Sequence, residues 1–482
     1  MPRIDTAEAY KDSLKALSTE VYFMGERIED IVEHPATRPH VNCAAMTYRM
    51  AELPESQPLL TATSHLTGER INRFTHIHQS AEDLLQKVRM LRTLANTTGS
   101  CFQRCVGFDA LNALYSVTYE IDQKKGTDYY PRFVKFLQHV QEQNLMCTGA
   151  MTDPKGDRGL RPSQQADPDL YVRVVQEGPE GIVVRGAKAH QTGAVNSHEI
   201  IVMPTIALRP EDRDYAVSFA VPSDTPGILY IFGRQSNDER KLAGESIDMG
   251  NCNFGLVGGE ALVIFEDVFV PWERVFMCGE HDFADLLVER FATHHRLNYG
   301  GCKGGVSDVI LGAATAIAEY NGVAKASHIR DKLAEIILLT ETLYAGSIAA
   351  ACEGYATPSG AFYPNPLLAN AVKQNVTRYI YEIARLAHDI TGGILATLPS
   401  EKDLKSPRVG EYIEKYFKGV EGLPTEHRIR IVRLIENMTA GTALAESMHG
   451  AGSPQAQRVM LLRQANLEHK KQLARRLAGI CT

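Results

Sequence analysis

The sequence predicts an α+β protein whose three parts follow one another along the chain. These are an N-terminal helical domain over residues 1–146, a middle antiparallel β domain over 147–280, and a C-terminal four-helix bundle over 281–482. Apolar residues recur at helical spacing in the first and third parts. Short runs rich in β-branched and aromatic residues, separated by turn residues, fill the second part. At 482 residues the chain is long enough for two or three domains.

The N-terminal part is expected to contain three main helices. The first covers residues 80–96, where Ser80 stands at the capping position and apolar residues repeat on one face. The next two cover about 101–121 and 132–145. Cys101 and Cys105 are four residues apart, so one helical face would present both sulfurs. They lie near the predicted helix start, where the helix dipole favours a thiolate.

The middle part contains five runs with strand character. They cover residues 170–175, 181–190, 199–208, 216–222 and 261–271, and turn clusters such as GPEG and PSDTPG separate them. We therefore expect one compact antiparallel β domain.

The C-terminal part contains four long stretches with helical spacing and few helix breakers. They cover residues 327–353, 369–390, 428–448 and 455–477. Pro454 stands just before the last of them, at a position typical of the first residue of a helix. Four long helices after a β domain predict a bundle.

Composition and charge exclude several classes of protein. The chain is 44% hydrophobic and 23% charged, as is usual for a globular protein, and its formal net charge of -7 gives no electrostatic reason to bind nucleic acid. No apolar run approaches the roughly 20 residues that a membrane span requires. The polar N-terminus lacks a signal-peptide core. The nine cysteines are scattered and odd in number, unlike a disulfide framework. We therefore expect a reduced, soluble, cytoplasmic protein.

The stretch from residue 289 to 305, ERFATHHRLNYGGCKGG, concentrates chemically active side chains. His295 and Cys302 are seven residues apart, about two helical turns, and so lie on one face. Gly300 and Gly301 disfavour a helix interior but let the backbone approach something bulky. Together with Cys101 and Cys105, this pair could bind a structural zinc ion or an iron–sulfur cluster with one non-thiolate ligand. Alternatively, the four are unrelated buried residues, since neither spacing matches a common zinc signature.

Two loop segments have the polar and small residues that could surround a flavin, although each could also be an ordinary turn. Residues 150–159, AMTDPKGDRG, follow the N-terminal helices directly. Residues 186–200 place Gln191 and Thr192 between two predicted strands. Two basic segments, 427–434 and 469–479, could pair with phosphates or could be solvated helix faces.

Two further features have one functional and one structural interpretation each. Glu260 lies between two glycines and an apolar strand, where it could be an acid/base group with a raised pKa or a solvated turn residue. The run from Gly450 through Ala451 to Gly452 precedes a helix start, where it could bind a pyrophosphate or form a plain turn.

Two motifs resemble those of the acyl-CoA dehydrogenase-like flavoproteins. AMTDPKGD (150–157) is similar to their flavin-contacting A-M-T-E-P-x-x-G-S-D pattern, and VFVPWERV (268–275) is similar to the strand that closes their β domain. Within this superfamily the whole chain resembles the branch of the 4-hydroxyphenylacetate 3-monooxygenases and the 4-hydroxybutyryl-CoA dehydratases. The monooxygenases carry no cluster, whereas the dehydratases bind a [4Fe-4S] cluster through three cysteines and one histidine.

The fragments CFQRC (101–105) and HRLNYGGCKGG (295–305) match the dehydratase motif. The resemblance therefore implies a [4Fe-4S] cluster on Cys101, Cys105, His295 and Cys302, with the spacing favouring His295 over His294. It also implies FAD, contacted by the following residues: Gln103, Met151, Thr152, Asp157, Arg158, Gln191 and Thr192, with Gly450, Ala451 and Gly452 from a neighbouring subunit of a homotetramer.

The implied reaction is the reversible radical dehydration of 4-hydroxybutyryl-CoA to crotonyl-CoA, together with isomerisation of vinylacetyl-CoA. The resemblance implies His295 or Glu446 as the base, Glu260 as a further functional carboxylate, and Tyr299 and Lys303 as hydrogen-bonding groups. Two alternatives remain open. One is a reductase-fed, flavin-dependent aromatic monooxygenase, and the other is a zinc-stabilised scaffold without catalytic activity.

Overall fold

The computed structural model describes residues 3–243, 245–250, 254 and 258–480. The helices in these ranges are α1 (Ala7–Lys15), α2 (Arg38–Glu52), α3 (Gln57–Leu60), α4 (Ala81–Thr98), α5 (Cys105–Lys125), α6 (Tyr129–Gln143), α7 (Asp238–Ala243), α8 (Ser246–Met249), α9 (Ala284–Tyr320), α10 (Ser327–Cys352), α11 (Pro366–Thr391), α12 (Glu401–Leu404), α13 (Gly410–Tyr416), α14 (Thr425–Met438), α15 (Gly441–His449), α16 (Pro454–Gln464) and α17 (Leu467–Leu477). The strands are β1 (Glu20–Phe23), β2 (Glu26–Ile28), β3 (Thr61–Thr63), β4 (Arg70–Asn72), β5 (Cys147–Ala150), β6 (Arg173–Glu177), β7 (Gly181–Thr192), β8 (Glu199–Val202), β9 (Val217–Pro222), β10 (Ile228–Phe232), β11 (Glu260–Pro271), β12 (Val275–Cys278), β13 (Tyr355–Ala356) and β14 (Phe362–Tyr363).

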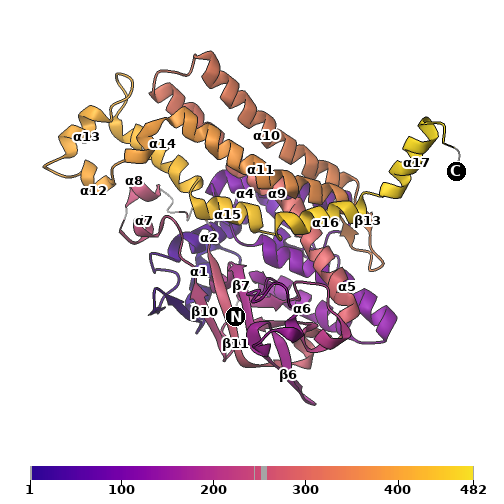
Figure 1. Ribbon diagram of the computed structural model, residues 1–482. Coiled ribbons are helices and arrows are strands. Elements are labelled where there is room, and N and C mark those ends of the chain that lie inside the picture. Colours follow the sequence, from indigo (N-terminus) through magenta and orange to yellow (C-terminus); the bar gives the residue numbers. More distant parts are fainter. Residues whose placement is uncertain (1–2, 244, 251–253, 255–257, 481–482) are drawn as a thin grey trace.

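Two sheets form the β part of the molecule, below the long helices in Figure 1. The larger has the strand order β2-β1-β10-β11-β7-β6, and the smaller has the order β12-β9-β8-β5. The prediction of a purely antiparallel domain is wrong in two places, because β1 pairs with β10 and β5 pairs with β8 in parallel. β1 and β5 are each four residues long, and their partners β10 and β8 are far along the chain. No hairpin turn therefore marks either pairing in the sequence.

The N-terminal region also contributes strands to the larger sheet, which the sequence did not predict. The hairpin of β1 and β2 adds to its edge, beside β10. Val21 and Phe23 are buried while their neighbours are partly exposed, which is the alternation of a strand with one buried face. This pattern covers only four residues after a helix, too few to distinguish it from a loop.

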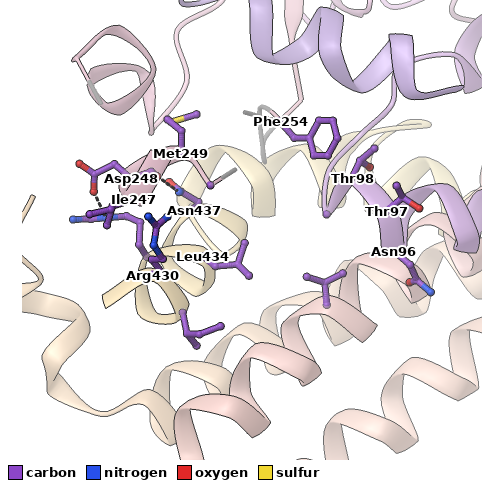
Figure 2. Close-up of a pocket in the computed structure, with 15 residues that line it drawn as sticks. Asn96, Thr97, Thr98, Ile247, Asp248, Met249, Phe254, Arg430, Leu434 and Asn437 are labelled. Carbon is purple, nitrogen blue, oxygen red and sulfur yellow. Dashed lines mark hydrogen bonds and ion pairs between the residues drawn. The ribbon is translucent and has the colours of Figure 1, made fainter. Parts of the chain in front are cut away.

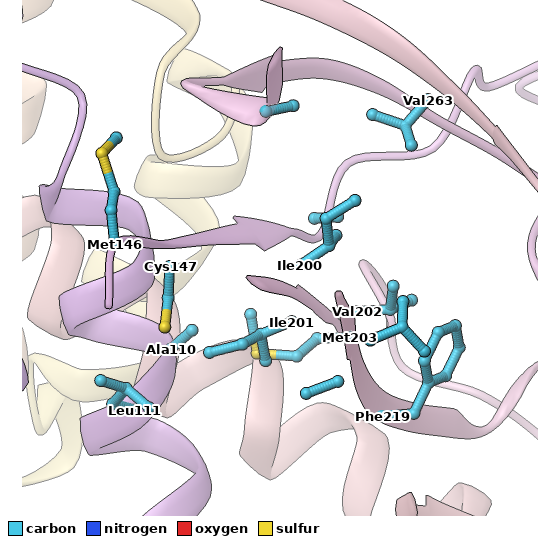
Figure 3. Close-up of a cluster of buried hydrophobic side chains, with 14 of the residues drawn as sticks. Ala110, Leu111, Met146, Cys147, Ile200, Ile201, Val202, Met203, Phe219 and Val263 are labelled. Atoms are coloured by element: carbon cyan, nitrogen blue, oxygen red, sulfur yellow. The ribbon is translucent and has the colours of Figure 1, made fainter. Parts of the chain in front are cut away.

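Apolar side chains of α5 fill the space against the smaller sheet. Figure 3 shows Ala110 and Leu111 of this helix beside Cys147 of β5 and Ile201 of β8, all of them buried. A Cβ atom at Gly107 of α5 would overlap the backbone of Cys147, so α5 lies directly on β5. This contact fixes the start of α5 relative to the sheet.

Three long helices, α9, α10 and α11, pack against one another along their length, and α4 packs against α9 and α10 (Figure 1). The N-terminal part therefore supplies a helix to the bundle. Two predicted helices are each divided in two. The stretch 428–448 breaks before α15, where Ala440 is extended, and 455–477 breaks at Asn466, which has a left-handed φ of 43°. Pro454 begins α16, as predicted.

One described helix, α10, is long and apolar enough to cross a membrane by length and composition alone. Charged residues occupy its first turns, so the sequence contains no unbroken apolar run there. In the most apolar part of this helix, 33% of the residues are buried. Core helices of soluble proteins pass the same test, so this finding is a weak argument for a membrane span.

Candidate active site

Helix α9 carries four of the predicted site residues, namely His295, Tyr299, Cys302 and Lys303. The prediction that His295 and Cys302 share one helix is confirmed. The glycines between them allow close helix contacts. A Cβ at Gly300 would overlap Ser347 of α10, and one at Gly301 would lie 2.6 Å from the carbonyl oxygen of Val88 in α4. Alanine at either position would force the helices apart.

Cys101 and Cys105 do not share a helical face, contrary to the prediction. Cys105 is the first residue of α5, whereas Cys101 lies in the loop after α4. Gly99 ends α4 with a φ of 62°, and Gln103 has a φ of 65°, so two residues between α4 and α5 have left-handed backbone. A left-handed glutamine is uncommon and gives no reliable sequence signal.

The three cysteines from these two segments meet in the interior. Cys105 and Cys302 contact the same apolar cluster, and the charges of Cys101 and Cys302 both influence the titration of Cys105. Burial raises the pKa of all three thiols, that of Cys302 to about 11. Burial therefore outweighs the helix dipole, which was predicted to favour a thiolate. No group of three or more His, Cys, Asp or Glu side chains within the described ranges converges on a single metal ion.

The ring of His295 is held by a buried carboxylate that the sequence analysis did not identify. Nδ1 of His295 lies 2.7 Å from Oδ2 of Asp109. The same Oδ2 accepts a hydrogen bond from Asn298 at 2.6 Å, and Oδ1 accepts one from Lys87 at 2.5 Å. Burial alone would raise the pKa of Asp109, but Lys87 and His295 lower it. An ionised Asp109 needs a donor at Nδ1, so Nε2 carries the free lone pair of the neutral ring.

The neighbouring His294 has different surroundings. Its ring packs 5.7 Å from that of His78 and 5.3 Å from that of Tyr363, centroid to centroid. Burial lowers its pKa well below the usual histidine value. The two adjacent histidines therefore point into separate environments, and Asp109 orients His295.

Lys303 and Glu446 form an ion pair that joins α9 to α15. Nζ of Lys303 lies 2.7 Å from Oε2 of Glu446. Burial would lower the pKa of Lys303, but attraction to Glu446 and the nearby thiols raises it overall. Burial would raise the pKa of Glu446, but Lys303 lowers it. Both groups are therefore charged near neutral pH.

Glu260, the first residue of β11, lies close enough to this pair to interact electrostatically with both Glu446 and Lys303. Its carboxyl is 3.4 Å from the hydroxyl of Thr192 and 3.3 Å from the amide nitrogen of Gln235. Burial, followed by repulsion from Glu446, raises its pKa to about 7. Of the two interpretations of Glu260, these surroundings favour an acid/base group over a solvated turn residue.

Several buried polar atoms beside Glu260 have no hydrogen-bond partner among the described residues. They are both amide atoms of Gln103 and Nδ1 of His40. A Cβ at Gly259 would lie 2.9 Å from both of these side chains. Buried polar groups in native proteins are almost always paired, so a polar group bound here would supply the partners that these atoms lack.

The two predicted flavin segments come together beside this place. The side-chain amide of Gln191 donates to the carbonyl oxygen of Thr152 at 2.8 Å, and Lys188 donates to the carbonyl oxygen of Met151 at 2.9 Å. Asp157 and Arg158, in contrast, are exposed on the loop beyond. The carboxylate of Asp157 accepts a hydrogen bond from the backbone of Gly159, which is a turn-forming role.

The segment from Gly450 to Gly452 is a turn between α15 and α16. The N–H groups of Gly450 and Gly452 already donate to the carbonyls of Glu446 and His449. The carbonyl oxygen of Ala451 accepts a hydrogen bond from Arg296 at 3.0 Å. The predicted anion-binding nest is therefore not formed by these N–H groups. Instead, Gly450 contacts the hydroxyl of Tyr299 so closely that a Cβ would overlap it.

A separate pocket of about 320 Å³ lies between α4, α8 and α14, as Figure 2 shows. None of the predicted catalytic or cluster residues lines it. Its two arginines come from the basic segment 427–434, and both have carboxylate partners. Arg430 pairs with Glu426, and Arg433 pairs with Asp248. These pairs favour the structural interpretation of that segment, and α17 carries the other basic segment on an exposed face.

Comparisons with known proteins agree over the whole chain. Two family models match, described as the N-terminal part (residues 6–277) and the C-terminal part (residues 284–479) of 4-hydroxyphenylacetate 3-hydroxylase. A 4-hydroxybutyryl-CoA dehydratase/vinylacetyl-CoA-Delta-isomerase of Clostridium aminobutyricum is 55% identical over 98% of this chain and 99% of its own.

Two solved structures are similar as well. An oxygen-tolerant archaeal 4-hydroxybutyryl-CoA dehydratase from N. maritimus has a TM-score of 0.97 at 51% identity, over 99% of this chain and 96% of its own. The oxygenase component of 4-hydroxyphenylacetate 3-monooxygenase, complexed with FAD, has a TM-score of 0.86 at 26% identity, over 98% of each chain.

The predicted α+β class is confirmed. The structure of a glutaryl-coenzyme A dehydrogenase superposes with a TM-score of 0.50 at 12% identity, over 85% of this chain and 82% of its own. A likeness at that identity shows the acyl-CoA dehydrogenase-like fold alone.

Proposed function

We infer the function from the fact that this chain belongs to the 4-hydroxyphenylacetate 3-hydroxylase family, and within it to the 4-hydroxybutyryl-CoA dehydratases. The observation that carries the inference is 55% identity to a dehydratase/isomerase over nearly the full length of both chains. The curated aromatic monooxygenases of the family are far less similar, at 29% identity or below. The chain is therefore a dehydratase that acts on 4-hydroxybutyryl-CoA, with vinylacetyl-CoA isomerase activity.

The flavin of this family is FAD, as in the FAD complex of the related oxygenase. We propose that its ring lies against Met151, Thr152, Gln191 and Thr192. The unpartnered amide of Gln103 supports this place, because a flavin edge offers both donors and acceptors. Asp157 and Arg158 are exposed, so they would reach FAD only from outside the ring site.

The iron–sulfur cluster is a proposal that rests on the donor set. One buried cysteine, Cys105, two partly buried cysteines, Cys101 and Cys302, and one histidine with a free Nε2 suit a [4Fe-4S] cluster, in which each ligand binds a different iron atom. A zinc ion would require four donors around one point, and no such convergence exists within the described ranges. We assign Cys101, Cys105, Cys302 and Nε2 of His295 as the ligands. When bound, the cluster supplies a Lewis-acidic iron and FAD supplies one-electron chemistry.

The side chains of the chain itself would bind the substrate and move its protons. The pKa of Glu446 is lowered and that of Glu260 is raised. This difference suits Glu446 to act as a base and Glu260 to act as an acid. Glu446, ionised beside Lys303, is the candidate base. Glu260, with a pKa near 7, can hold or release a proton at neutral pH. Lys303 and the hydroxyl of Tyr299 would donate hydrogen bonds to the substrate oxygens.

The assembly and the cellular location are also proposals. In a homotetramer, the turn at residues 450–452 would complete the FAD site of a neighbouring subunit. His190 lies within electrostatic reach of both Lys155 and His449, and we propose that these three basic side chains receive the FAD phosphates. The cytoplasmic location stays a prediction from the sequence. Sedimentation of the FAD-replete protein tests the tetramer, and an FAD-replete monomer contradicts a shared site.

The function is tested on protein purified without air. We expect flavin absorption bands over a broad brown absorbance, about four iron atoms per chain, and conversion of 4-hydroxybutyryl-CoA to crotonyl-CoA. Cys302→Ala should lose iron and turnover together, whereas Cys352→Ala, which changes an exposed free cysteine at the end of α10, should keep both. A Cys302→Ala protein with its full iron content contradicts the ligand assignment. If the purified protein contains no iron and hydroxylates a phenol with reduced flavin and oxygen, the proposed function is wrong and the chain is an aromatic monooxygenase.

A further inference from the structure

The short helix α15 carries Glu446, and its C-terminal end is held by a buried lysine of α11. Nζ of Lys373 donates to the carbonyl oxygens of Ser447 at 2.5 Å and of Met448 at 3.2 Å. The last carbonyls of a helix have no partner within it, and a cation there also stabilises the helix dipole. Lys373 is fully buried, so water does not compete for these bonds.

The same ammonium group contacts Tyr299. It lies 3.9 Å from the centroid of the tyrosine ring, which is cation–π geometry. The hydroxyl end of Tyr299 is closed in by Gly450, the first residue after α15. The ring is therefore bounded by Lys373 on its face and by the α15 terminus at its hydroxyl.

Arg296 of α9 holds the next part of the same turn. Its Nε donates to the carbonyl oxygen of Ala451 at 3.0 Å, and its guanidinium donates to the side chain of Asn370 of α11 at 2.5 Å. Two buried basic side chains, from α9 and α11, thus bind three carbonyls at the C-terminal end of α15 and in the turn after it. The start of α15 is held separately, by hydrogen bonds between Thr442 and Ser236.

We propose that Lys373 is a positioning residue for this reaction, which fixes the hydroxyl of Tyr299 and the carboxylate of Glu446 relative to each other. It acts through these two residues, because its Nζ already contacts two carbonyls of α15 and the ring of Tyr299. The proposal rests on the proposed function, in which Tyr299 and Glu446 contact the substrate. Burial lowers the pKa of Lys373 well below its usual value despite the opposing charge of Glu446, and both the protonated and the neutral amine can donate to the carbonyls.

The first test measures the backbone. Lys373→Met keeps an unbranched side chain, one atom shorter, and removes the donor, so the carbonyls of Ser447 and Met448 lose their partner. We expect amide hydrogen exchange at residues 441–452 to rise at least about tenfold while exchange in α14 is unchanged. The matched control is Lys332→Met, which removes a partly exposed lysine of α10 paired with Asp389 of α11. Unchanged exchange at 441–452 in Lys373→Met refutes the proposal whether or not the protein turns over substrate.

The second test uses turnover and a double-mutant cycle. We expect Lys373→Met to lower kcat by about 10²-fold and to change KM by less than about threefold. This is the effect expected when Tyr299 and Glu446 are still present but are displaced from their positions. In the background of Tyr299→Phe, which keeps the ring and removes the hydroxyl, Lys373→Met should cost less than about tenfold. Equal losses in both backgrounds would show that Lys373 does not act through Tyr299 and would overturn the proposal.

If Lys373→Met does not fold, Lys373→Gln is used for both measurements. Its amide can still donate to one of the two carbonyls, so it should give the same pattern with smaller effects. Failure of the proposed function is recognised separately, as absence of dehydratase turnover in the unmodified protein.

Discussion

Replacing Gly301 with alanine tests whether the close contact between α9 and α4 builds the site. The added Cβ would lie 2.6 Å from the carbonyl oxygen of Val88, where ordinary contacts begin at 3.4 Å, so α4 or α9 would have to move by about 0.8 Å. A backbone carbonyl inside a helix cannot turn aside as a side chain can. The neighbouring residues Cys302 and Lys303 would move with the helix.

The magnitude follows from two opposing effects. Alanine favours a helix interior over glycine by about 1 kcal/mol, and overpacking costs about 1–3 kcal/mol. We therefore expect Gly301→Ala to lose up to about 2 kcal/mol of stability. Gly312→Ala is the matched control on the same helix, because a Cβ there meets nothing within 4 Å. It should gain about 1 kcal/mol.

The assay compares thermal unfolding, iron content and turnover of the two variants. Gly301→Ala should unfold at a lower temperature than the parent and bind less iron, because α9 carries Cys302 away from the loop of Cys101. Gly312→Ala should unfold slightly higher with iron unchanged. If Gly301→Ala is as stable as Gly312→Ala and keeps its iron, the close contact is not what assembles the site.

Three further predictions concern titration and the histidine. Because burial raises the pKa of Glu260 to about 7, the folded chain keeps a proton that the unfolded chain loses near pH 4.3. This contribution to stability is full below about pH 4.3 and is lost as the pH rises through about 7, so Glu260→Gln should lose less thermal stability than the parent between about pH 5 and 8. Asp109→Asn should leave His295 unoriented and weaken iron retention by about 10–100-fold, measured by challenge with a chelator, and unchanged retention would contradict the role of Asp109. His295→Cys, reconstituted with iron and sulfide, should keep a cluster and lose turnover by about 10²–10⁴-fold, and near-normal turnover would show that the imidazole is dispensable.

Local spacing predicted the parts of the site that one helix carries. The seven residues between His295 and Cys302 required only the regular geometry of α9. The loop at Cys101 could not be predicted in the same way, because Gln103 has a left-handed backbone and packs against Gly193 and Gly259, which are far along the chain. Spacing within a helix is a local property, whereas this loop depends on strands far along the chain.

The supporting residues of the site could not be found from the sequence for a related reason. Asp109 and Lys373 lie on mostly buried helices, where a charged side chain is unusual, and that contrast was the available signal. Their partners are 186 and 74 residues away in the chain. A lone charge in an apolar helix predicts that a partner exists and does not say which residue it is.

The four proposed cluster ligands come from two stretches of chain separated by about 190 residues, with most of the two sheets between them. In the unfolded chain these stretches rarely meet, since closing so long a loop is entropically unfavourable. The complete donor set therefore exists only after the sheets have formed and α4 has docked on α9. A cofactor that binds the native chain and not the unfolded one shifts the equilibrium toward the native chain. Incorporation of the cluster would then select for molecules whose N-terminal and C-terminal halves have already joined, so that a misassembled chain would be left without iron.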